Sequence, residues 1–192
     1  MDKKVEKAVE ILKSGGIVLL PTDTVFGICC RIDNNKALER LFAIKKRENS
    51  QAVPILVSST DMVKEYAQPF NEKIEKLMEQ YWPGGLTIVI KAKKEKVLPL
   101  VRGDGDTVGV RIPDSVSLFQ IIEEVGVPIT GTSANFHGLP SVKNWKDLDP
   151  RLVQLVDYVL EEDSLGGTAS TVVDCSEENW KILRQGAVTI KL

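Results

Sequence analysis

The chain has 192 residues, of which 43% are hydrophobic, and a formal net charge of −2. This size suits one globular domain over residues 1–192, and the net charge disfavours a dedicated nucleic-acid binder, which is usually basic. The three cysteines have no framework spacing, so we expect buried thiols rather than disulfides, and with only one histidine in the chain we expect no zinc site. No apolar run approaches the ~20 residues that cross a bilayer, so we expect a cytoplasmic protein that does not span a membrane.

The N-terminal half of the sequence predicts alternating helices and strands. Apolar residues at i, i+3, i+4 and i+7 indicate a first helix from Val5 to Leu12, and the Gly15-Gly16 pair ends it. Two more helical stripes occupy residues 37–42 and 74–78, and Ser59 can cap a helix of its own. Short apolar runs predict strands over residues 17–20, 25–30 and 53–57.

The C-terminal half mixes the two kinds of element without strict βαβ alternation. A turn at 82–85 precedes a strand at 86–90. The charge run 91–96 predicts a solvated loop, and the stretch 91–106 is a candidate mobile lid. A helical stripe occupies 118–125, and a short helix is expected near Arg151. Further strands are expected at 107–112, 127–131, 156–160, 171–174, 180–183 and 188–190. We therefore expect an α/β fold with a twisted mixed sheet and flanking helices.

Motifs for two common mechanisms are missing or incomplete. There is no GxxxxGK[ST] phosphate loop, and the glycines from Gly103 do not complete GxGxxG. Asn135 stands where a nucleophile elbow has its second glycine, and the single histidine, His137, follows Ser133 within the same loop. The sequence therefore disfavours both a P-loop enzyme and a serine hydrolase.

Two polar segments in the first quarter of the chain are candidates for binding. Residues 21–27 (PTDTVFG) lie between two predicted strands and form either a ligand rim or a turn held by Asp and Thr side chains. Residues 45–47 (KKR) end a predicted helix. They either complement its dipole or clamp a phosphate or carboxylate.

Four later segments carry further polar side chains at strand ends. Arg111 lies among apolar strand residues in 107–113 (TVGVRIP), so it needs either a carboxylate partner in the protein or an anionic ligand. The loop 130–141 (TGTSANFHGLPS) offers hydroxyls and an amide to phosphate or ribose oxygens. Residues 170–174 (STVVD) and 184–187 (RQGA) are weaker signals.

In this order, the six segments resemble the threonylcarbamoyl-AMP synthase (YrdC-like) family in its single-domain form, from about Gly15 to Gly186. The resemblance implies a sheet around a concave, positively lined cavity. It implies the reaction of L-threonine, bicarbonate and ATP, with Mg²⁺, to threonylcarbamoyl-AMP and pyrophosphate, the first step of threonylcarbamoyladenosine modification of tRNA. It also implies transient contact with the tRNA threonylcarbamoyl-transferase complex or tRNA.

Roles follow from the resemblance residue by residue. The implied threonine contacts are Thr24, Arg111, Gly131 and Ser170. The implied ATP contacts are Arg47, Gln51, Thr107, Ser133, Asn135, Ser141 and Arg184. The implied catalytic cations are Lys45, Arg47 and Arg111. A carbamate that attacks an α-phosphate brings two anions together, and fixed cations offset that repulsion.

The sequence departs from the family pattern in three places. His137 stands before Gly138 where a serine is frequent, and a histidine that many members carry after KxR is absent from residues 55–58. Phe26 replaces a frequent tyrosine.

Two other functions stay open. One is a non-catalytic RNA-binding module whose basic patch would consist of Lys36, Arg40, Lys45, Lys46 and Arg47. The other is a paralogue that makes a different carbamoyl-type adenylate.

Overall fold

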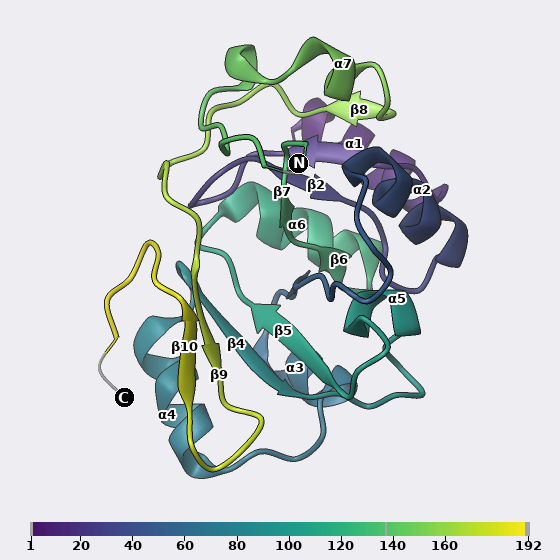
Figure 1. Ribbon diagram of the computed structural model, residues 1–192. Helices are drawn as coiled ribbons and strands as arrows, with labels where there is room; N and C mark the ends of the chain where they lie inside the picture. The colour runs from purple at the N-terminus through teal and green to yellow at the C-terminus, as the bar shows by residue number, and fades with distance from the viewer. Residues whose placement is uncertain (1, 137, 191–192) are drawn as a thin grey trace.

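The computed structural model describes residues 2–136 and 138–190, and it has two mixed β-sheets flanked by helices (Figure 1). The helices are α1 (Lys3–Lys13), α2 (Asn35–Lys45), α3 (Thr60–Tyr66), α4 (Glu72–Tyr81), α5 (Pro99–Arg102), α6 (Val116–Val125) and α7 (Pro150–Val153), with a 3₁₀ turn η1 (Trp145–Asp147). The strands are β1 (Val18–Leu20), β2 (Gly27–Cys29), β3 (Ile55–Leu56), β4 (Leu86–Lys91), β5 (Thr107–Arg111), β6 (Ile129–Thr130), β7 (Thr132–Ser133), β8 (Tyr158–Val159), β9 (Thr171–Asp174) and β10 (Lys181–Arg184).

The strands form a four-stranded sheet in the order β7-β2-β1-β8 and a six-stranded sheet in the order β10-β9-β4-β5-β3-β6. Each contains parallel and antiparallel pairs, so the expected mixed sheet is present as two sheets. The chain crosses between them at Gly131, which separates β6 from β7. Leu56 pairs with Arg111 on one side and with Ile129 on the other, which places the end of β5 near this crossing.

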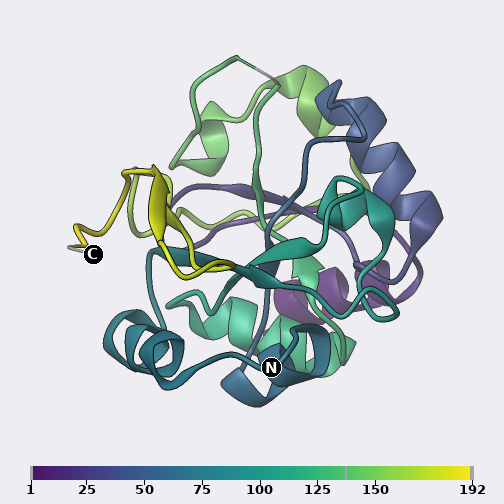
Figure 2. The same cartoon turned by 60° about the horizontal axis from the view of Figure 1, so that its bottom comes forward.

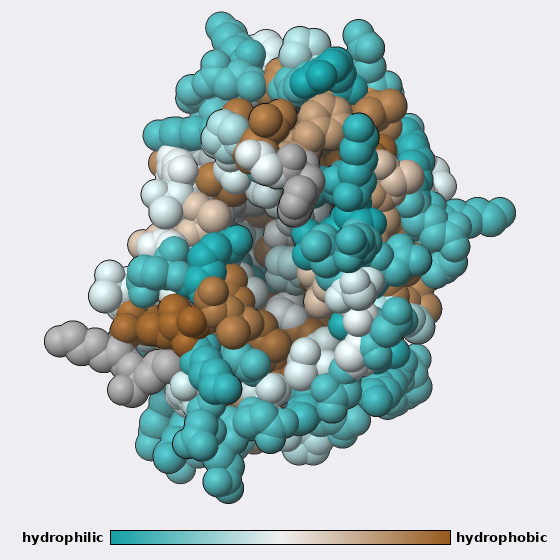
Figure 3. Space-filling view, in the orientation of Figure 1, coloured by the Kyte–Doolittle hydropathy of each residue, from teal (hydrophilic) through white to brown (hydrophobic). Residues whose placement is uncertain are grey.

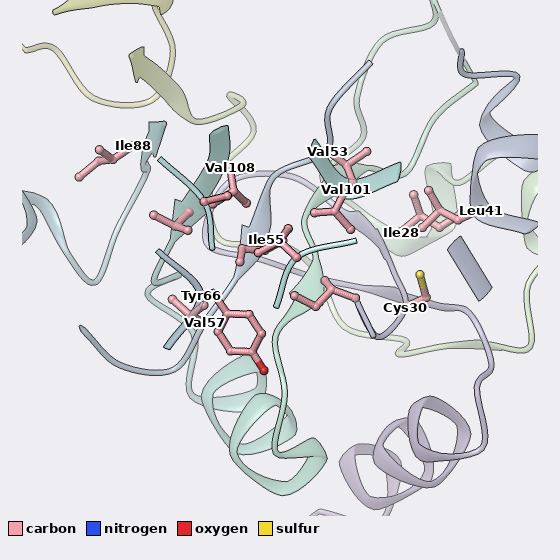
Figure 4. Packing of buried hydrophobic residues seen from close by; sticks show 14 of the residues in the cluster. Ile28, Cys30, Leu41, Val53, Ile55, Val57, Tyr66, Ile88, Val101 and Val108 are labelled. Atoms are coloured by element: carbon pink, nitrogen blue, oxygen red, sulfur yellow. The ribbon is translucent and has the colours of Figure 1, made fainter. Parts of the chain in front are cut away.

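Two hydrophobic clusters hold the sheets and helices together. The smaller joins α1 and α6 to β1, with Leu12, Leu20 and Ile122 fully buried. Figure 4 shows part of the larger cluster, including Ile28, Ile55 and other residues from strands of both sheets. Helices lie on both sides of the strands when the molecule is turned (Figure 2). Each such fully buried aliphatic side chain contributes roughly 1.5–3 kcal/mol.

The predicted helices are confirmed, and their capping chemistry agrees with the sequence. Ser59 caps α3 by accepting a hydrogen bond from the Met62 amide, and α1 gives way to Gly15 in the left-handed region. The expected buried thiols are confirmed, and burial raises the pKa of Cys30 and of Cys175 to about 12. Among residues 2–136 and 138–190, no helix combines the length and apolar character needed to span a membrane.

Three expectations about secondary structure need correction. The strand predicted at 188–190 is wrong, because the N–H and carbonyl of Val188 bond to the Thr171 hydroxyl rather than to a neighbouring strand. The loop predicted from Thr132 begins with β7. The sequence predicts no helix within 91–106, but α5 lies there, and Val97 and Val101 pack in the larger cluster.

Candidate functional site

A cavity of about 240 Å³ lies where the two sheets meet, and its walls come from strand ends and loops. The space-filling view is hollowed on this face of the molecule (Figure 3). Most of the predicted site residues line it, namely Thr24, Lys45, Arg47, Arg111, Gly131, Ser133, Asn135, Ser170 and Arg184. The fold therefore brings together segments that are far apart in the sequence.

Three predicted site residues do not line this cavity. Gln51 contributes its backbone carbonyl, which accepts a hydrogen bond from Arg47 Nε at 3.0 Å. Thr107 begins β5, at the opposite end of the strand from Arg111 and therefore about 13 Å away at the usual rise per residue. Ser141 follows the loop that contributes Asn135 to the cavity. Their predicted contacts would require a ligand that extends beyond the cavity.

Arg111 is the most constrained cation of the site. Its guanidinium forms an ion pair with Asp23, and the two side chains are only 6% and 9% exposed. Arg111 Nε donates to the Gly84 carbonyl and Nη1 donates to Thr24 Oγ1, both at 2.9 Å. Burial lowers the pKa of Arg111, and the Asp23 charge opposes that shift. Of the alternatives that the sequence left open, the protein itself supplies a carboxylate partner, while the guanidinium still faces the cavity.

Lys45, the last residue of α2, fixes the loop after β7. Its Nζ donates to the Ser133 carbonyl at 2.5 Å, to the Asn135 carbonyl at 2.7 Å and to Asn135 Oδ1 at 2.9 Å. The Ser133 hydroxyl also donates to Asn135 Oδ1, at 2.7 Å. Burial, followed by the nearby Arg47 charge, lowers the pKa of Lys45 to about 8. The ammonium therefore orders the loop while lying in the cavity wall.

Arg47 and Arg184 approach the cavity from different elements. Arg47 follows α2, and its Nη2 donates to the Ala52 carbonyl, which ties it to the segment before β3. Arg184 ends β10 and donates from Nε to the Ser170 carbonyl at 3.0 Å and from Nη2 to Ser170 Oγ at 3.2 Å. Burial lowers the pKa of both guanidiniums. Backbone carbonyls hold both side chains, and neither forms an ion pair within the described residues.

The described lining of the cavity is cationic and hydroxylic. It carries Lys45, Arg47, Arg111 and Arg184 and no aspartate or glutamate side chain. Across residues 2–136 and 138–190, no group of three or more His, Cys, Asp and Glu side chains is placed to hold a metal ion. This chemistry suits an anionic ligand rather than a metal ion bound directly by the protein.

Sequence reasoning missed several residues of the site. Thr22 and Leu56 line the cavity, and Asp23 pairs with Arg111 behind it. Thr22 and Asp23 belong to the PTDTVFG motif, so the motif itself was the available signal. No sequence signal marked Leu56, because an apolar residue in a short strand is normally assigned to the core. His137 lies outside the described residues.

Gly131 and Gly186 keep the walls of the cavity close together. A Cβ on Gly131 would lie 2.8 Å from the Leu56 side chain, and one on Gly186 would lie 2.2 Å from the Ala169 carbonyl oxygen. Both Ala169 and Leu56 line the cavity. A larger residue at either glycine would therefore displace a wall of the site.

Comparison with known proteins gives one consistent family. The Sua5/YciO/YrdC family model, described as "Telomere recombination", matches residues 10–186. The threonylcarbamoyl-AMP synthase of Bacillus subtilis is 30% identical over 98% of this chain, which spans 55% of that protein's length. A putative threonylcarbamoyl-AMP synthase of Methanocaldococcus jannaschii is 32% identical, with 97% of this chain and 89% of that protein aligned. The crystal structure of P. abyssi Sua5 complexed with L-threonine superimposes with a TM-score of 0.90 at 28% identity, over 95% of this chain and 54% of that one.

The Asp23–Arg111 pair is expected to contribute far more to stability than an exposed ion pair. In Asp23→Asn, a buried guanidinium loses its counter-charge, and we expect the free energy of unfolding to fall by about 3–5 kcal/mol. The matched control is Glu72→Gln, which removes the same charge from the exposed Lys76–Glu72 pair and should cost at most about 1 kcal/mol. Urea denaturation measures both variants, and equal small losses would contradict the assigned role of Asp23.

Proposed function

We propose a function from the premise that the chain belongs to the Sua5/YciO/YrdC family, whose model matches residues 10–186. The chain acts as an L-threonylcarbamoyladenylate synthase, an ATP-dependent nucleotidyltransferase. It joins L-threonine, bicarbonate and ATP into threonylcarbamoyl-AMP and pyrophosphate, the first step of threonylcarbamoyladenosine modification of tRNA. The observation that carries this proposal is the cavity with four cationic side chains and no carboxylate in its described lining.

The reaction needs such a cavity because it brings two anions together. The neutral threonine amine forms a carbamate, either with bicarbonate by loss of water or with carbon dioxide by loss of a proton. A carbamate oxygen then attacks the α-phosphate of ATP and displaces pyrophosphate. Fixed cations offset the repulsion between carbamate and phosphate, and they require no reorganisation because the protein already holds them. No covalent nucleophile is needed, which agrees with the incomplete serine-hydrolase motif.

The positions of the side chains favour one division of the cavity. Arg111, Thr24 and Ser170 form the threonine side, because a guanidinium can take the substrate carboxylate beside hydroxyls that take polar groups. Lys45 and Arg47, at the end of α2, form the phosphate side together with the loop hydroxyls after β7 and with Arg184. Gln51, Thr107 and Ser141 would contact the part of ATP that extends beyond the cavity.

Magnesium enters this proposal as part of the nucleotide substrate. The described lining offers no carboxylate ligand, and Mg²⁺ is commonly bound through substrate phosphates and water. The residues of this chain therefore bind and orient the phosphates rather than hold a resident ion. The proposed location is the cytoplasm, and the product would pass to the tRNA threonylcarbamoyl-transferase complex.

The RNA-binding alternative loses its proposed basic patch. Arg40 Nη1 lies 2.6 Å from the Asp157 carboxylate, and Lys45 is buried against the loop after β7. Of the lysines in the proposed patch, Lys36 and Lys46 are the two that remain exposed. Two exposed lysines would provide little phosphate neutralisation along an RNA strand.

Pyrophosphate release tests the proposal directly. With ATP, magnesium and bicarbonate, we expect release that depends on L-threonine. Release should be much weaker with L-valine, because a site built to bind a hydroxyl penalises its absence, and modestly weaker with L-serine, which keeps the hydroxyl but lacks the methyl group. Arg111→Ala should lower kcat/KM by about 100-fold or more. Arg31→Ala, outside the cavity lining, is the control and should leave the rate unchanged.

Arg111→Lys is a second variant for the case in which Arg111→Ala does not fold. Lysine keeps a positive charge beside Asp23, which supports folding, but it lacks the planar guanidinium that binds a carboxylate through two hydrogen bonds. A folded Arg111→Lys enzyme with the full wild-type rate would contradict the proposed carboxylate contact. Release that is equal for all amino acids would point to the paralogue with another substrate. No release, together with tight and salt-sensitive RNA binding, would replace the synthase by the binding module.

The lowered pKa of Lys45 predicts a pH-dependent affinity for ATP. A lysine is charged below its pKa, so Lys45 loses its charge as the pH rises through about 8. We expect the Kd for ATP to increase between pH 7 and 9 in the wild type. Lys45→Met should bind ATP more weakly and show a flatter profile across that window. Calorimetric titration at several pH values measures both, and parallel profiles would exclude Lys45 as the titrating group.

A further inference from the structure

Thr22, which the proposed function leaves without a role, has a hydroxyl with an unusual number of partners. Thr22 Oγ1 lies 2.8 Å from the Val25 carbonyl oxygen, 2.9 Å from Thr24 Oγ1, 3.0 Å from the Thr24 amide and 3.2 Å from the Val25 amide. Its own backbone is anchored on both sides, since Thr22 N–H donates to Ser164 Oγ and its carbonyl accepts from the Leu165 amide. The hydroxyl is therefore fixed in position.

The direction of each hydrogen bond follows from counting protons. A hydroxyl has one proton, and a carbonyl oxygen can only accept. The proton between Thr22 Oγ1 and the Val25 carbonyl must therefore come from Thr22. Thr22 then has no proton for Thr24, so the proton between the two hydroxyls comes from Thr24 and takes one lone pair of Thr22 Oγ1. The Thr24 and Val25 amides, at 3.0 and 3.2 Å, share the other lone pair.

The same count fixes what Thr24 presents to the cavity. Its proton points at Thr22, and one of its two lone pairs accepts from Arg111 Nη1 at 2.9 Å. What remains is a single acceptor lone pair on a side chain that is 3% exposed and lines the cavity. A ligand carboxylate, which also only accepts, cannot bond to it. A ligand N–H or O–H can.

We infer that Thr22 is a positioning residue that holds Thr24 as a hydrogen-bond acceptor for a donor group of the amino-acid substrate. Arg111 and Thr24 Oγ1, 2.9 Å apart, then form a pair of opposite polarity: the guanidinium takes the carboxylate and the oxygen takes a neighbouring amine or hydroxyl. The inference rests on the proposed function for the identity of the substrate, but the polarity of Thr24 follows from the protein alone.

Calorimetric titration of variants tests this role with two probes of opposite chemistry, L-threonine and 2-oxobutyrate, which has a carboxylate but no donor group. In Thr22→Val the Thr24 proton loses its acceptor and is free to turn toward the ligand. We expect L-threonine to bind about tenfold more weakly and 2-oxobutyrate to bind more tightly than to the wild type. Thr22→Ser, which keeps the hydroxyl, should stay within about twofold of the wild type.

A double-mutant cycle separates positioning from direct binding. Because Thr22 acts through Thr24, adding Thr22→Val to Thr24→Val should cause no further loss of L-threonine affinity. The control is Thr130→Val, which removes another buried hydroxyl that bonds to the backbone, at the Cys30 amide and the Ile28 carbonyl, outside the cavity lining. It should lower stability without changing either affinity. Additive losses in the cycle, or equal weakening of both probes by Thr22→Val, would overturn the inference.

A ligand-free measurement distinguishes this inference from the proposed function. In threonine-labelled protein, NMR should detect a Thr24 hydroxyl proton that is protected from solvent exchange in the wild type and loses that protection in Thr22→Val. A Thr24 proton that exchanges freely in the wild type would overturn the assigned polarity. If the wild type fails to bind L-threonine while the proton is protected, the proposed function fails and the polarity stands.

Discussion

The ion pair between Asp23 and Arg111 is the interaction on which the site depends. It ties the turn after β1 to the end of β5, so it joins the two sheets at the wall of the cavity. A guanidinium this deeply buried would destabilise the fold without a counter-charge, and Asp23 supplies that charge. Asp23 does not line the cavity, so the described lining stays free of carboxylates. The protein thus keeps a fixed cation in the wall of the site that we propose for anionic substrates.

The other cations are held in the same way but by neutral partners. Lys45, Arg47 and Arg184 donate to backbone carbonyls or an amide side chain, which fix their positions without cancelling their charges. Positive side chains fixed near one another repel, and the lowered pKa of Lys45 partly reflects Arg47. Binding of the proposed anionic substrates would relieve that unfavourable energy, which is the arrangement expected of electrostatic preorganisation.

Local patterns were sufficient to predict most elements, because a helical stripe such as Val5 to Leu12 and a cap such as Ser59 act within a few residues. They could not predict α5, because a four-residue helix is too short to show a hydrophobic period. They also could not predict the division into two sheets, because the pattern within a strand does not indicate which strand it pairs with. The motifs located most of the cavity lining. They did not reveal that Asp23 pairs with Arg111, because the two residues are 88 positions apart in the sequence.

The crystal structure of the complex with L-threonine and a non-hydrolysable ATP analogue would test the central claim most directly. The account predicts the threonine carboxylate at Arg111, a substrate donor group at Thr24 Oγ1, and phosphates between Lys45, Arg47 and Arg184. Phosphates at Arg111, or threonine bound outside the cavity, would contradict the division of the site and the role given to its buried ion pair.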